Sequence, residues 1–171
     1  QAQAQAPVFS IHAISNDLDH AQVAAGLLRQ EQIKTALYED DYLTVRAKAR
    51  LEDAFGVIRF EPLQNAPEKL RQIKDPEEIA LIEKACAISD HAFKLVCSKI
   101  GPGMSEIGIK RMLDNQMLEL GADGTAFDTI VASGANGSLP HAIAGERKVQ
   151  KGDMITLDFG AKYRGYCADM T

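Results

Sequence analysis

The final stretch of the chain, MITLDFGAKYRGYCADMT (residues 154–171), decides the fold of the C-terminal part. Two runs within it, 154–160 and 165–170, contain apolar and β-branched residues typical of short strands. A polar step near Tyr163 and Arg164 separates them, as expected for a tight turn. The sequence therefore predicts an antiparallel β-hairpin here.

The hairpin carries two acidic residues that could bind a metal ion. If Lys162 pairs with Gly165, Asp158 lies directly opposite Asp169 on the same face of the sheet. Opposed carboxylates with Cβ atoms about 4.5–5.5 Å apart repel each other. A divalent cation such as Mn²⁺, which carboxylate oxygens suit, would remove that repulsion. The alternative is two solvated acids at strand ends. Cys167 shares the face and is expected to be a packed thiol rather than a ligand.

Two amphipathic helices are predicted before the hairpin. The segment 75–78 (Asp-Pro-Glu-Glu) is a strong helix start with a capping box, and 101–103 (Gly-Pro-Gly) ends that helix. Ser105 caps the next helix and Gly121 ends it. Their apolar stripes are Ile79, Ile82, Cys86, Ser89, Phe93, Val96 and Ile100 in the first, and Ile109, Met112, Leu113, Gln116, Met117 and Leu120 in the second. Helices followed by an antiparallel sheet, which includes a strand at 125–132, indicate an α+β domain.

The first third of the chain has a different pattern. Strand-like runs at 8–14, 33–38 and 57–60 alternate with two helical runs. The first helix begins after Asp17 or Asp19, and the second covers 44–55. Such alternation predicts parallel βαβ units. A boundary in the segment 62–67 divides the chain into an α/β domain at 1–66 and the α+β domain at 67–171.

His141 is the third candidate site residue. It follows Leu139 and Pro140 at the end of a Gly/Ser/Asn loop, 133–138. An imidazole held by a neighbouring proline could move protons or donate a hydrogen bond; the alternative is an ordinary exposed histidine. The loop lacks the Lys-Ser/Thr of a phosphate-binding P-loop, and the chain has neither a Gly-x-Ser-x-Gly elbow nor a Cys-x-x-Cys pair.

Composition narrows the class further. The chain has 171 residues, a net charge of -5 and a pI of about 5.4, which argues against a nucleic-acid partner. No apolar run reaches the length that crosses a membrane. Three widely spaced cysteines make no disulfide framework and favour a reducing compartment, so we expect a cytoplasmic protein.

Several of these segments together resemble the pita-bread (M24) metallopeptidases, the family of Xaa-Pro dipeptidase (prolidase) and Xaa-Pro aminopeptidase. The strongest matches are 73–79, 127–134, 139–141, and the hairpin with its Asp-x10-Asp spacing. The resemblance implies an α+β fold, namely the N-terminal half of a pita-bread catalytic domain. Residues 1–66 would be a partial α/β domain like the N-terminal domain of creatinase.

The resemblance also implies roles for the three residues. Asp158 would chelate one metal ion, Asp169 would bridge two, and His141 would assist substrate binding and proton movement. The cofactors would be two divalent metal ions (Mn, Co or Zn), and a metal-bridged hydroxide would attack the bond before proline. The substrate would be a small proline-containing peptide, and the parent protein would be a homodimer.

One departure qualifies this expectation. The family needs a further histidine and two glutamates after the hairpin, and this chain ends at Thr171. We therefore expect a fragment, truncated at both ends and inactive by itself. Two alternatives stay open: a non-catalytic pita-bread binding module, and a creatinase-like C–N hydrolase that uses the fold without two metals. The retained Asp158 and Asp169 weigh against both.

Overall fold

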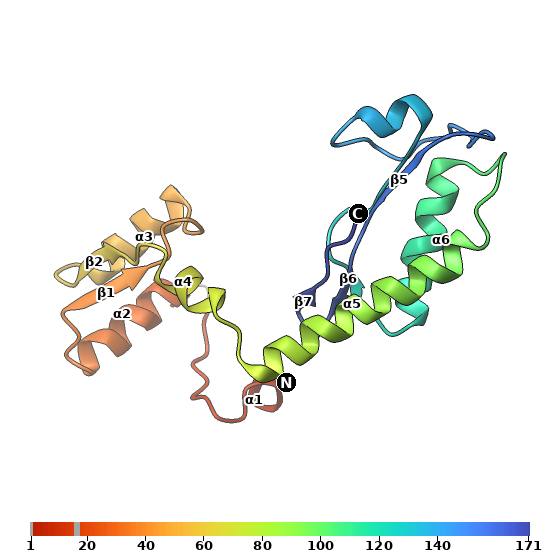
Figure 1. Cartoon of the computed structure of the whole chain (residues 1–171). Coiled ribbons are helices and arrows are strands. Elements are labelled where there is room, and N and C mark those ends of the chain that lie inside the picture. Colours follow the sequence, from red (N-terminus) through yellow and green to blue (C-terminus); the bar gives the residue numbers. More distant parts are fainter. Residues whose placement is uncertain (1, 16–17) are drawn as a thin grey trace. The chain divides into compact units, whose positions relative to one another are not determined.

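The chain forms two compact units, Gln1–Ile73 and Lys74–Thr171. The structure is a computed structural model and describes residues 2–15 and 18–171. Both units are drawn in Figure 1. The contacts divide the chain after Ile73, and the domain boundary expected between residues 66 and 67 stays a prediction.

The N-terminal unit is a small α/β arrangement. In chain order it contains α1 (Ala2–Gln5), α2 (His20–Gln30), β1 (Thr35–Tyr38), α3 (Val45–Phe55), β2 (Arg59–Pro62) and α4 (Ala66–Gln72). Strands β1 and β2 pair in parallel, with Thr35 opposite Arg59 and Tyr38 opposite Pro62. Parallel neighbours need a crossover, which α3 supplies. The βαβ unit predicted over 33–60 is therefore confirmed.

Side-chain caps explain where helices α2 and α3 begin. The Asp19 carboxylate accepts from the Gln22 amide while the Gln22 side chain accepts from the Asp19 amide, a reciprocal capping box. Thr44 caps α3 through the Ala47 amide. The alternative cap at Asp17 lies outside the described residues.

The strand predicted over 8–14 is wrong. These residues form no regular strand, and Val8, Phe9, Ile11 and Ile14 are exposed. A strand needs a neighbour for its backbone hydrogen bonds. Within the described part of this unit, the only paired strands are β1 and β2. Residues 8–14 are therefore apolar but have no neighbouring strand to pair with.

The C-terminal unit packs two helices against antiparallel strands, as Figure 1 shows. Its elements are α5 (Pro76–Cys97), α6 (Glu106–Glu119), β3 (Gly124–Thr125), β4 (Ile130–Ser133), the 3₁₀ helix η1 (Gly134–Ser138), β5 (Ile155–Asp158), β6 (Ala161–Tyr163) and β7 (Tyr166–Cys167). Strand β6 lies between β3 and β7, and β4 pairs with β5. The single strand predicted over 125–132 is thus two short ones, each with a different partner.

Three of the predicted helix signals act as expected in this unit, whereas α5 ends at Cys97, before the Gly-Pro-Gly segment 101–103 expected to end it. The Asp75 carboxylate accepts from the Glu77 and Glu78 amides, and the Glu78 side chain accepts from the Asp75 amide. Ser105 accepts from the Gly108 amide at the start of α6. Gly121 follows α6 with a φ of 95°, a left-handed conformation that glycine adopts without strain.

The core lies between the two helices and the strands. From α6 it contains Ile109, Leu113 and Met117, as predicted. From α5 it takes a face that overlaps the predicted stripe in part: Ser89 and Val96 are buried as predicted, together with Ala85, Ile88 and Ala92, whereas Cys86 and Phe93 are exposed. Small residues such as alanine let α5 approach its neighbours closely. The periodicity of large apolar residues did not predict their burial, because alanines carry little apolar surface.

The hairpin turn is made by Arg164 and Gly165, with φ values of 48° and 88°. Two-residue turns of type I′ need positive φ at both positions and match the natural twist of the strands. Tyr163 consequently pairs with Tyr166, and Lys162 does not lie opposite Gly165. The predicted register was wrong by two residues because it placed Gly165 in a strand rather than in the turn.

Gly160 marks a close backbone approach inside the hairpin. A Cβ built on it would lie 1.8 Å from the carbonyl oxygen of Ala168, which no real contact allows. We expect Gly160→Ala to lower the free energy of unfolding by about 3 kcal/mol, because the obstacle is backbone and cannot rotate away. Urea denaturation measures this. Gly124→Ala in neighbouring β3 is the matched control, since its Cβ would meet nothing within 4 Å. If both variants lost the same free energy of unfolding, the close backbone approach at Gly160 would be contradicted.

Candidate metal centre and active site

Asp158 ends strand β5, and its partner across the hairpin is not Asp169. Phe159 pairs with Met170 through two backbone hydrogen bonds, each 3.0 Å long. This register puts Asp158 opposite Thr171, whose hydroxyl donates to the Asp158 carboxylate at 3.2 Å. The direct opposition of the two aspartates is therefore corrected. Asp169 precedes Thr171 by two residues and so lies on the same face as Asp158, as a diagonal neighbour.

Asp158 also faces a small pocket in the C-terminal unit, with a volume of about 280 Å³. The pocket is bounded by strands β4 and β5, by the end of η1 and by the C-terminal residue. Its lining residues are Ile130, Gly137, Ser138, Leu139, Pro140, Thr156, Asp158 and Thr171. Aliphatic side chains line it together with hydroxyls and one half-buried carboxylate, a mixture typical of a small-ligand site.

His141 is exposed and lies next to this pocket in the chain. Its predecessors Leu139 and Pro140 line the pocket, whereas His141 and Asp169 do not. The structure thus joins Asp158 to the loop that carries His141, and it leaves Asp169 at the exposed edge of the same face. Cys167, expected to be packed, is an exposed free thiol.

The donor chemistry of Asp158 and Asp169 fits a divalent cation in part. Within the described residues, no lysine, arginine or histidine forms an ion pair with either carboxylate, so their charge has no protein counterion. Carboxylate oxygens suit hard and borderline cations. No group of three or more His, Cys, Asp or Glu side chains that could hold a metal gathers anywhere in the described ranges. The two aspartates are therefore a partial ligand set.

One charged residue of this region, Glu106, carries no sequence pattern that marks it as functional. It occupies the first turn of α6 and is fully buried. One carboxylate oxygen accepts from the Ser133 amide at 2.7 Å and from the Ser133 hydroxyl at 2.8 Å. The other accepts from the Asn136 amide group at 3.1 Å and from the Gly145 backbone N–H at 3.3 Å. This carboxylate therefore binds both ends of the segment that contains His141.

These hydrogen bonds keep Glu106 ionised. Burial alone would raise the pKa of the carboxyl group, but the bonds from Ser133, Asn136 and Gly145 outweigh it and lower the pKa below its ordinary value. The first turn of a helix also favours a negative charge. Glu106 is thus a fixed anion beneath the loop.

An ion pair between Arg147 and Asp153 is connected to the hydrogen bonds of Glu106 through Ser133. The Arg147 guanidinium donates to Asp153 at 2.7 Å and also to the Ser133 hydroxyl. Asp153 accepts in addition from the Gln150 amide at 2.9 Å. The Arg147 hydrogen bond lowers the pKa of Asp153, and Asp153 raises the pKa of Arg147. Charges therefore alternate from Asp153 through Arg147 to Glu106.

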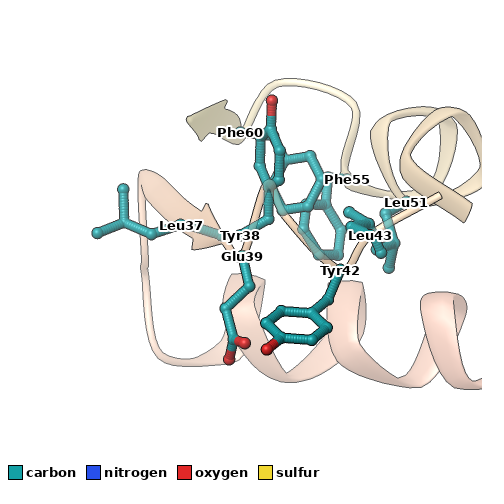
Figure 2. A pocket seen from close by; sticks show the side chains of 9 residues that line it. Leu37, Tyr38, Glu39, Tyr42, Leu43, Leu51, Phe55 and Phe60 are labelled. Atoms are coloured by element: carbon teal, nitrogen blue, oxygen red, sulfur yellow. The ribbon is translucent and has the colours of Figure 1, made fainter. Parts of the chain in front are cut away.

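A larger pocket of about 450 Å³ lies in the N-terminal unit and has a different character. Figure 2 shows its aromatic and aliphatic walls, with Leu37 directed away from the rings. Tyr38 and Phe60 pack with ring centroids 4.5 Å apart, and Phe55 meets Phe60 edge to face. Glu39 is the one charged lining residue. The pocket groups no pair of acids or bases and offers no candidate chemistry.

Comparison with known proteins is consistent with this reading of the C-terminal unit. Residues 80–171 match the model of metallopeptidase family M24. An uncharacterized peptidase of Bacillus subtilis, YqhT, is 37% identical over 169 residues, which is 99% of this chain and 48% of that protein. The Xaa-Pro dipeptidase of Pyrococcus furiosus is 38% identical over 116 residues, 68% of this chain and 33% of that protein.

Solved structures agree. The X-Pro aminopeptidase of Thermotoga maritima superposes with a TM-score of 0.90 and 36% identity, over 98% of this chain and 48% of that one. The chain therefore belongs to metallopeptidase family M24, and its mixed helix and strand structure matches the pita-bread fold of that family. The chain matches YqhT and the Thermotoga maritima enzyme over nearly all of its own length, but it spans only about half of theirs. In the described parts of the chain, no helix is long and apolar enough to cross a bilayer.

Proposed function

We propose that this chain forms part of a metal-dependent peptidase that hydrolyses the bond before proline in small peptides. The observation that carries the proposal is the pocket that joins Asp158 to the loop of His141, within a domain of family M24. Relatives named as an Xaa-Pro dipeptidase and an X-Pro aminopeptidase support the substrate class.

Asp158 and Asp169 are the residues that would hold metal ions. When bound, two divalent cations (Mn, Co or Zn) supply Lewis-acid polarisation of a carbonyl and a water of lowered pKa. Asp158 would bind one ion and Asp169 would bridge two. Because these residues are an incomplete ligand set, the remaining ligands belong to residues beyond Thr171 in a protein of the relatives' length.

His141 is the proton-handling residue in this proposal. Its exposed imidazole stands on the loop that bounds the pocket and can donate to the substrate carbonyl or to the leaving nitrogen. We expect His141→Ala to lower kcat about a hundredfold while bound metal, measured by elemental analysis, changes little. His91→Ala, on the exposed face of α5, is the matched control. A parallel loss of metal would instead make His141 a ligand.

The experiment that tests the function compares two proteins with two substrates. One protein has the length of the relatives and contains this chain; the other is the 171-residue chain alone. Each is assayed with Mn²⁺ on an Xaa-Pro dipeptide and on a tripeptide with proline second. We expect turnover from the longer protein and none from the 171 residues, because two aspartates do not complete a shell for two ions. Metal-dependent turnover by the short chain would contradict the ligand assignment.

The same assay addresses the other functions considered above. Neither a creatinase-like C–N hydrolase nor a binding module would turn over an Xaa-Pro peptide, so metal-dependent turnover by the longer protein would contradict both. The paired carboxylates without a protein counterion favour the peptidase. We further infer that the N-terminal unit belongs to a creatinase-like α/β domain, and that the parent protein is a cytoplasmic homodimer.

A further inference from the structure

We propose that Glu106 is a positioning residue, which holds the His141 loop in place by clamping both of its ends. This inference rests on the proposed function, since it concerns how His141 is presented. Glu106 lies on α6, away from the pocket lining, so it acts through the loop and not on a substrate.

The clamp joins two points that are far apart in the sequence. At the start of the loop, Ser133 donates twice to one oxygen of Glu106 and Asn136 donates to both oxygens. At the far end, the Gly145 N–H donates to the second oxygen. The single buried carboxylate of Glu106 therefore binds both ends of the loop 134–144, which contains His141.

Backbone bonds from the same helix turn strengthen the far end. The Glu106 N–H donates to the Arg147 carbonyl and the Ile107 N–H donates to the Gly145 carbonyl, each at 3.0 Å. Gly145 is thus held through both its N–H and its carbonyl, at the N-terminal end of a rigid helix. Gly145 therefore fixes the C-terminal end of the loop that contains His141.

The loop itself contributes little internal structure between these fastenings. After η1, the Leu139 N–H donates to the Asn136 carbonyl at 3.0 Å and the Ala142 N–H donates to the Leu139 carbonyl at 3.3 Å. Ala142 and Ala144 are buried, whereas Ile143 is 89% exposed. Ala144 belongs to the core, but an alanine methyl is small, so the exposed His141 is positioned mainly by how the two ends of the loop are held.

Glu106→Gln separates the two ends of the clamp. The glutamine amide keeps one acceptor oxygen and replaces the other with an NH₂ group, which cannot accept a hydrogen bond. Whichever way the amide turns, one end of the loop then faces a donor instead of an acceptor. With the oxygen retained by Ser133, where two donors converge, the Gly145 N–H loses its partner.

The first measurement does not depend on activity. Amide hydrogen exchange is followed in the 171-residue chain for the wild type, Glu106→Gln and the control Glu119→Gln. Glu119 is exposed at the other end of α6. We expect exchange at 139–147 to become at least tenfold faster in Glu106→Gln while the α5 core amides are unchanged. Unchanged protection of 139–147 would overturn the clamp.

The second measurement is a double-mutant cycle in the longer protein. We expect Glu106→Gln to lower kcat about tenfold with a small change in KM and in bound metal, because a displaced group costs rate more than binding. In a His141→Ala background the same substitution should cost less than twofold, since its route of action has already been removed. Equal costs in both backgrounds would contradict positioning of His141.

The two measurements keep this inference distinct from the proposed function. If the longer protein cleaves no Xaa-Pro bond, the function fails, yet the exchange result still decides whether Glu106 holds the loop. If activity is present and Glu106→Gln reduces only thermal stability, with kcat intact well below the unfolding temperature, Glu106 is a structural residue and the positioning role is overturned.

Discussion

Replacing Asp158 with alanine is expected to abolish peptidase activity in a protein of the relatives' length that contains this chain. The change removes the half-buried carboxylate of the pocket and half of the charge proposed to hold metal. Loss of metal assistance worth about 4 kcal/mol in the transition state corresponds to roughly a thousandfold in kcat. Steady-state kinetics with saturating Mn²⁺, together with measured metal content, test this expectation.

Two further variants distinguish the metal role from a structural one. Asp158→Asn keeps the shape and can still accept from the Thr171 hydroxyl, but it removes the charge. We expect it to be as inactive as the alanine variant while unfolding at the wild-type urea concentration. Asp90→Ala, an exposed acid on α5, controls for net charge and should be fully active. Substantial activity in Asp158→Asn would remove Asp158 from the site.

Glu106→Ala is expected to be the most destabilising single change considered for the C-terminal unit. It leaves the Ser133 amide and hydroxyl, the Asn136 amide and the Gly145 N–H without their acceptor in a buried place. Removing one member of such a network costs about 3–5 kcal/mol. Urea denaturation of the 171-residue chain measures this, and Glu119→Ala on the same helix should cost below about 0.5 kcal/mol. A similar small loss for both would contradict the proposed network.

The same carboxylate gives a pH test with a defined sign. Its pKa is lower in the folded state than in the unfolded chain, where glutamate titrates near 4.3. Its stabilisation is therefore complete above that value and is lost as the pH falls through the lower, folded pKa. We expect the wild type to lose more stability than Glu106→Gln between about pH 5 and pH 3. A wider gap at low pH would mean the opposite sign.

Local signals predicted much of this fold. The capping box at Asp75, the Ser105 cap and the Gly121 terminator each depend on a few neighbouring residues, and each is confirmed. Pairing was harder, because it depends on which residue occupies the turn. Counting Gly165 as a strand residue shifted the hairpin by two positions, although the face of each aspartate survived, since strands alternate with a period of two.

The candidate site was predictable only where its chemistry is written locally. Asp158, Asp169 and His141 stand in short recognisable motifs, and their roles stay predictions. Glu106 gave no such signal, because its partners Ser133 and Gly145 follow 27 and 39 residues later. A glutamate at the start of a helix is ordinarily exposed, and only the packed structure shows that this one is buried.

The Arg164–Gly165 turn also determines on which side of the hairpin each acidic residue lies. Because it consists of two residues, the ten positions between Asp158 and Asp169 bring both acids to one side of the hairpin. With the Tyr163–Tyr166 pair kept, one residue inserted between Tyr166 and Asp169 would send Asp169 to the opposite side, whereas two would move it one step along the strand and keep it on the same side. Insertions in this strand segment therefore follow parity, because an even number preserves a shared acidic face and an odd number destroys it.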